Sequence, residues 1–282
     1  MSKKRQRLVY MEEEIVPQKR FHFNFRELWE YRELFYFFTW RDVKVKYKQT
    51  FLGILWAIIQ PLAIALILNY SLGTTISKNS TLPIPYLAFV FSGFILWTVF
   101  SGGLTNAANS MVSNANIIKK IYFPRLVIPL SAVLSSVFDF LFALIVFFGI
   151  SFYYSVPISI WAFICIPVGL FLTVIAALGS GILLSALNIK YRDFRYAVPF
   201  LIQGLLFLTP VIYPINVSNN VIVNFILKCN PVAAGLEIFK GSYTDYPIQA
   251  SIIYYSLFSN LLIFLIGIYY FRKTESYFAD LA

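Results

Sequence analysis

The chain has 282 residues, of which 59% are hydrophobic, 19% aromatic and only 13% charged, and its formal net charge is +10. Soluble domains carry about 25% charged residues, so this composition, with a mean hydropathy of +0.71, excludes an ordinary soluble enzyme or binding module. It indicates an integral membrane protein. The basic excess does not predict a nucleic-acid partner, because 12 of the 23 Lys and Arg residues lie in the first 48 positions and most others flank apolar runs. Cations in such places set membrane topology.

The first 20 or so residues are polar, and an aromatic, charged stretch follows them up to Lys48. Residues 1–22 form a charged tail without the early apolar run of a cleavable signal peptide. Residues 23–48 predict an amphipathic helix in the headgroup plane that ends in a basic segment. Acidic side chains on its polar face, at Glu27, Glu30 and Glu33, suggest a protein partner, because helices that bind only lipid prefer Lys and Arg there.

Long windows without charge follow this segment. A membrane-spanning helix needs about 20 apolar residues, and the windows hold six such stretches. We expect spans near 53–73, 86–106, 127–152, 161–187, 197–214 and 250–270. The sequence therefore predicts an all-α integral membrane protein, with a six-span domain over residues 49–272 and a short C-terminal tail at 273–282.

The cations between the spans predict the orientation. If the N-terminus is cytoplasmic, 20 of the 23 Lys and Arg residues lie inside, and only Lys78, Lys228 and Lys240 lie outside. The positive-inside rule favours this arrangement. We expect both termini in the cytoplasm.

The external segment 215–249 is the largest loop. It holds two apolar stretches, "VIVNFIL" and "AAGLEIF", which are too short to span. Prolines at 214, 231 and 247 bracket them. We expect two short re-entrant helices between the fifth and sixth spans, and this loop is a candidate outer gate, since irregular backbone at membrane depth must be covered by protein or line a water-filled cavity.

Little in the chain indicates catalysis. No Gly-Lys dipeptide is present, so the chain lacks a phosphate-binding Walker A loop, and no cluster has metal-ligand spacing. Asp139 is the one ionisable residue well inside a span. It is either a functional carboxylate or a group hydrogen-bonded to Ser, Asn or Tyr on a neighbouring helix. We expect no enzymatic activity, no metal and no cofactor bound by this chain.

Aromatic residues exceed what interfacial belts need. Aromatic faces with hydroxyl tips suit sugars, which stack and hydrogen-bond. Candidate channel-lining residues are Trp56, Trp97, Phe207 and Tyr213.

Four blocks carry a resemblance to a known family. They are "RDVKVKYKQTFLGILWAIIQPL" at 41–62, "NANIIKKIYFPRLVIPLSAVLSSVFDF" at 114–140, "LNIKYRDFRYAVPFLIQGLLFLTPVIYPI" at 187–215 and "CNPVAAGLEIFKG" at 229–241. In this order they resemble the permease subunit of ABC-2 type polysaccharide exporters, which handle O-antigen, capsule or teichoic acid. The tail 1–22 has no counterpart.

The resemblance implies a homodimer in the bacterial inner membrane that binds two copies of a separate ATP-hydrolysing subunit, through which ATP and magnesium act. The segment between spans 2 and 3 would dock that subunit, with candidate residues Asn114, Asn116, Lys119, Lys120, Tyr122, Phe123 and Arg125. The alternative for this segment is a topology signal alone. The basic residues Arg41, Lys44, Lys46 and Lys48 would lie where the diphosphate head of a lipid-linked glycan gains access.

Three other classes compete with a lipid-linked polysaccharide exporter. An ion-coupled secondary transporter predicts paired intramembrane carboxylates or repeated halves, and we find neither in the sequence. A membrane glycosyltransferase predicts catalytic acids at a membrane face, where the external segments offer only Glu237 and Asp245. An exporter of drugs or small lipids would share the fold, and so would one for teichoic acid or capsule.

Overall fold

The computed structural model describes residues 29–48, 52–79, 82–121, 123–215, 220–244 and 246–275. Every named element in these residues is a helix. In chain order they are α2 (Arg32–Lys48), α3 (Leu55–Asn79), α4 (Tyr86–Ser113), α5 (Ala115–Ile118), α6 (Val127–Tyr153), α7 (Ala162–Lys190), α8 (Phe194–Phe207), α9 (Val221–Lys228), α10 (Ala233–Lys240) and α11 (Ala250–Thr274). The expected all-α class is confirmed.

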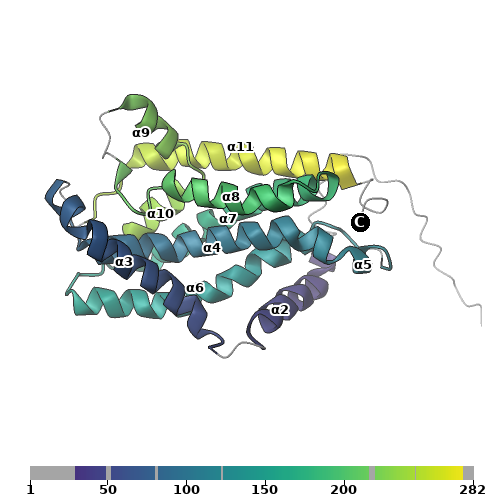
Figure 1. The fold of residues 1–282 in the computed structure, drawn as a ribbon, viewed down its shortest axis with the longest axis horizontal. Helices are drawn as coiled ribbons and strands as arrows, with labels where there is room; N and C mark the ends of the chain where they lie inside the picture. Colours follow the sequence, from purple (N-terminus) through teal and green to yellow (C-terminus); the bar gives the residue numbers. More distant parts are fainter. Residues whose placement is uncertain are drawn as a thin grey trace, which may run out of the picture.

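The long helices run roughly along one direction, with α5 at one end of the bundle and α9 at the other (Figure 1). The central helix is α4, which contacts α3, α6, α7, α8 and α10 and is buried over most of its length. By contrast, α3 exposes nearly all of its span. The core of the chain therefore forms around α4, and α3 lies at its periphery.

Among the described residues, five helices are long and apolar enough to cross a membrane, namely α3, α4, α6, α7 and α11. They begin within two residues of five of the six expected spans and end up to seven residues later, and α9 and α10 are the two short helices expected between the last two spans. These two helices are bent by 84° relative to each other, as in a broken span or a re-entrant loop.

The expected span at 197–214 differs from the structure. In its place the structure has a shorter helix of 14 residues, α8, which begins at Phe194 and ends at Phe207. Residues 208–215 leave the helix, and Pro210 and Pro214 explain why, since proline lacks the amide hydrogen that continues a helix. Thr209, Val211 and Ile215 in this segment are buried, so the irregular backbone is covered by protein, as membrane depth requires.

Glycine contacts set how closely the helices approach α7. A Cβ added at Gly267 of α11 would lie 2.4 Å from the Gly179 carbonyl oxygen of α7, and one added at Gly235 of α10 would lie 2.8 Å from that of Gly169. Small residues permit such backbone contact and favour helix association in lipid. They place α10 and α11 directly against α7.

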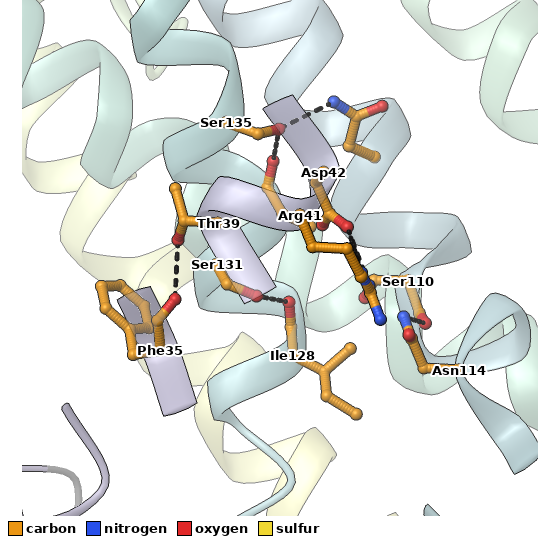
Figure 2. A network of polar contacts seen from close by, with 11 residues as sticks. Phe35, Thr39, Arg41, Asp42, Ser110, Asn114, Ile128, Ser131 and Ser135 are labelled. Atoms are coloured by element: carbon orange, nitrogen blue, oxygen red, sulfur yellow. Dashed lines mark hydrogen bonds and ion pairs between the residues drawn. The ribbon is translucent and has the colours of Figure 1, made fainter. Parts of the chain in front are cut away.

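The interfacial helix α2 packs against α6 rather than standing apart. Phe38 and Val43 form its buried face, while Tyr36 and Phe37 are exposed. Thr39 Oγ1 donates to the Phe35 carbonyl at 2.9 Å, which satisfies that hydroxyl within the helix (Figure 2). The predicted segment at 23–48 is thus helical from Arg32, and its first six residues lie outside the described residues, as does the tail 1–22.

Candidate functional site

The basic end of α2 presents two faces, and the four candidate cations divide between them. Lys46 turns inward and forms an ion pair with Asp139 of α6. The other three cations line a groove of about 280 Å³ on the outward face, whose walls are Phe37, Trp40, Arg41, Lys44, Val45 and Lys48. These six positions recur every three or four residues, so one stripe of a helix carries both the charges and the apolar walls.

The outward groove combines cations with aromatic faces. The Lys44 ammonium lies 5.4 Å from the centroid of the Trp40 ring, and the Arg41 guanidinium lies 4.8 Å from that of Phe38. Arg41 also pairs with Asp42 at 2.8 Å (Figure 2). The groove can therefore receive a phosphate on Lys44 and Lys48 and an apolar chain on its walls, with Arg41 held in place by its neighbour.

Asp139 is partnered on its neighbour helix. Its carboxylate accepts hydrogen bonds from the Lys46 ammonium and the Tyr47 hydroxyl. Burial raises the pKa of Tyr47 above its ordinary value, and the hydrogen bond and negative charge of Asp139 raise it further, so this phenol stays a donor. A tyrosine partner was one of the possibilities that the sequence left open. The lysine partner, 93 residues away in the chain, was missed.

The predicted docking segment lies at one end of the bundle. Asn116, Lys119 and Lys120 are exposed around the short helix α5. A groove of about 220 Å³ beside it is lined by Ile118, Lys119, Lys120, Ile121, Phe123 and Arg125. The segment thus offers both basic and apolar surface, and Tyr122 lies outside the described residues.

Two of the predicted docking residues are buried instead of facing outward. The Asn114 side-chain amide donates to the Ser110 carbonyl at 2.7 Å, and the residue is buried (Figure 2). Phe123 is also buried and packs on Phe38 of α2, with ring centroids 5.9 Å apart. The exposed Lys119 and Lys120 therefore lie between two residues that are packed into the bundle.

The end of α11 meets the docking segment, which sequence reasoning missed. Arg125 donates to the backbone carbonyl of Glu275, and the Glu275 carboxylate pairs with Arg272 at 2.9 Å. Charges near a span end predict topology but not their partners, so no pattern in the sequence indicated this contact. It places the start of α6 and the end of α11 at the same end of the bundle.

The four candidate channel aromatics occupy different environments. Trp56 and Phe207 are exposed, at 52% and 66% of their surface. Tyr213 is half-buried, and its hydroxyl donates to the Phe207 carbonyl. Trp97 is only 5% exposed and packs on Phe100 inside the core, with centroids 5.5 Å apart. Trp97 therefore stabilises the bundle of this chain, and only Trp56 and Phe207 offer a broad ring surface.

A polar network fixes the re-entrant pair at the opposite end. Asn230, between α9 and α10, donates to the Leu208 carbonyl at 3.0 Å and to Thr209 Oγ1 at 2.9 Å. Its own carbonyl accepts from Ser256 of α11 at 2.6 Å. The turn between the two short helices is therefore bound to both α11 and the segment after α8.

Among the residues that the structure describes, no three His, Cys, Asp or Glu side chains gather as a metal site would require. Cys165 and Cys229 are both free.

Comparison with known proteins adds a family to this geometry. The family model described as ABC-2 type transporter matches residues 33–244. Two proteins of Klebsiella pneumoniae named O-antigen export system permease protein RfbA are 30% identical over 247 residues and 31% identical over 251 residues, each covering 86% of this chain and 92% of the relative. A protein of the same name from Myxococcus xanthus is 26% identical over 222 residues, which cover 78% of this chain and 84% of the relative.

Proposed function

The chain belongs to the ABC-2 type transporter family, and on that premise we propose that it is the permease of an ATP-driven exporter of a lipid-linked cell-surface polysaccharide of the O-antigen class. The names of three relatives that align over most of their length support this substrate class. The observation that carries the proposal is the outward face of α2, where Lys44 and Lys48 lie beside apolar walls. A lipid with a diphosphate head offers both matching chemistries.

The headgroup site in this proposal consists of Arg41, Lys44 and Lys48. Lys46 is engaged by Asp139 and acts by holding α2 against α6. This division refines the expected set of four cations, because only residues on one stripe of the helix can contact one headgroup.

The partner in this proposal is a separate ATP-binding subunit, in two copies on a homodimer of this chain. It supplies ATP and magnesium, and it docks on the exposed Lys119 and Lys120. The contact of Arg125 with Glu275 supports a shared cytoplasmic side for this segment and the C-terminus. The cation distribution supports the same orientation in the bacterial inner membrane.

The first test is co-expression of this chain with a candidate ATP-binding subunit, followed by purification through a tag on this chain. We expect a stable complex whose ATPase activity responds to a lipid diphosphate glycan. Lys119→Glu and Lys120→Glu, together, should reduce recovery of the partner while the permease stays folded. Lys273→Glu, at an exposed position of α11 near the same end, is the control and should leave recovery unchanged.

The headgroup site is tested in the same complex. Replacing Arg41, Lys44 and Lys48 with Gln should raise the glycan concentration needed for half-maximal stimulation by on the order of tenfold or more, since hydrogen bonds to charged groups are the strong ones. Unchanged stimulation would remove the headgroup role. A folded chain that binds no ATPase would count against the proposed docking of an ATP-binding subunit.

A further inference from the structure

Lys240, the last residue of the re-entrant helix α10, is almost completely buried, with 2% of its surface exposed. Lysine is seldom buried to this extent unless its ammonium has partners. The sequence places it in an external loop, where a solvent-exposed lysine would be expected. Its position therefore needs a physical reason other than topology.

The Lys240 ammonium contacts two different elements. It donates a hydrogen bond to the Pro210 carbonyl at 3.0 Å, in the irregular segment that follows α8. It also lies 3.6 Å from the centroid of the Phe89 ring in α4, and Phe89 is itself wholly buried. One charged group thus joins α10, the 208–215 segment and α4.

The carboxylate one turn earlier on α10 is engaged on another side. Glu237 accepts from the Gln249 backbone amide at 2.8 Å and from the Tyr246 hydroxyl at 3.2 Å, both in the linker to α11. The ammonium of Lys240 is therefore directed to the 208–215 segment while Glu237 holds the linker. The two charges anchor opposite sides of the same short helix.

The helix α10 packs tightly against α7. A Cβ added at Gly235 would lie 2.4 Å from Thr173 Oγ1 of α7, so α10 has no room to move toward that helix. The 208–215 segment is the element that Lys240 contacts on the other side of α10. It is not helical, and buried carbonyls outside a helix need donors from elsewhere. Besides Lys240, donors come from Asn230, to the Leu208 carbonyl, and from Tyr86, whose hydroxyl donates to the Ile212 carbonyl at 2.9 Å.

We propose that Lys240 is a positioning residue whose ammonium holds the 208–215 segment, and with it the outer end of α8, against α10 and α4. Asn230, Lys240 and Tyr86 donate in turn to the carbonyls of Leu208, Pro210 and Ile212, so donors from three other elements are spaced along the first part of the segment. An apolar side chain of the same length would fill the space but leave the Pro210 carbonyl without this donor.

The test measures access to the segment and does not depend on transport. Val211, next to Pro210, is wholly buried, and it is replaced by Cys in a chain that also carries Cys165→Ala and Cys229→Ser. A membrane-impermeant maleimide is then applied to the outer side, and the labelling rate of Cys at position 211 is compared between variants of Lys240.

We expect Lys240→Met to increase the labelling rate by on the order of tenfold, because the hydrogen bond to the buried Pro210 carbonyl is lost while the side-chain volume is kept. Lys240→Arg retains the charge and should label nearly as slowly as the parent. Lys228→Met is the matched control, since Lys228 ends the other short helix α9 and should not change the rate. Equal rates for Lys240→Met and the parent would overturn the proposal, and so would an equal increase with Lys228→Met.

A second variant covers the case in which Lys240→Met does not fold, as judged by size-exclusion chromatography. Phe89→Leu removes the ring under the ammonium and should also increase labelling, whereas Phe91→Leu, at another wholly buried phenylalanine of α4, should increase it less. Equal rates for these two variants would overturn the role of the ammonium. Because no partner subunit or glycan is used, these results are independent of the proposed export function.

Discussion

The ion pair between Lys46 and Asp139 yields a prediction in which two neutralising substitutions have unequal effects. The side chain of Lys46 is 45% exposed, whereas that of Asp139 is 17% exposed. Replacing Asp139 with Asn leaves a lysine that can turn toward water. Replacing Lys46 with Met leaves a mostly buried carboxylate whose other side-chain partner is the Tyr47 hydroxyl.

The expected magnitudes follow from this difference in exposure. An unpaired buried polar group costs about 1–3 kcal/mol, and we assign this range to Lys46→Met. Since exposed ion pairs contribute only about 0–1 kcal/mol, Asp139→Asn should fall in that lower range. The double variant should lose little more than Asp139→Asn alone, which gives a coupling free energy about as large as the Lys46→Met loss, roughly 1–3 kcal/mol.

The assay is the apparent Tm of the purified permease in detergent, measured for both single variants and the double variant. For a chain of this size, 1 kcal/mol corresponds to roughly 2–4 °C, so Lys46→Met should lower the Tm by several degrees. Lys44→Met, on the outward face of the same helix, is the stability control and should change the Tm by about 2 °C or less. The reasoning is refuted if the two single effects are additive, or if Asp139→Asn destabilises more than Lys46→Met.

Two further substitutions test the packing and the hydrogen bonding. Gly267→Ala should destabilise the chain by about 1–3 kcal/mol, because its Cβ would lie 2.4 Å from the Gly179 carbonyl oxygen. Gly149→Ala is the control and should be neutral or slightly stabilising, because nothing lies within 4 Å of that position. Equal Tm values for the two variants would contradict the close contact between α11 and α7. Tyr47→Phe keeps the ring but removes the donor to Asp139, so we expect a loss of about 1 kcal/mol that grows in the Lys46→Met background, and a constant loss in both backgrounds would argue against a shared carboxylate.

The span positions could be predicted because the bilayer limits the choice. Uncharged stretches of about 20 residues have few stable forms in lipid, and five of them are long helices at the expected places. The early end of α8 could not be predicted in the same way. Residues 208–215 are as free of charge as a span, and donors from distant parts of the chain, such as Asn230 and Lys240, help to stabilise them outside a helix.

The sequence predicted which residues make up the candidate site, but not which way their side chains face. The four cations of α2 are equivalent in the sequence, and the pairing of Lys46 depends on how α2 packs on α6. The same limit applied to Trp97, because a tryptophan can pack in a protein core or line a channel. The structure places it in the core. Lys240 was counted as an external charge because burial of a lysine has no local signal.

The two proposed sites at one end of the bundle share a single packed cluster. Phe38 of α2 and Phe123 of the docking segment are both buried and in contact, and Ile118 and Phe271 belong to the same cluster. Close-packed interiors transmit displacement because they contain few voids that could absorb it. A shift of the segment around α5 would therefore move Phe123 against Phe38 of α2, the helix that also carries the outward basic groove. The proposed docking surface at Lys119 and Lys120 and the proposed headgroup site at Lys44 and Lys48 would thus rest on the same packed cluster.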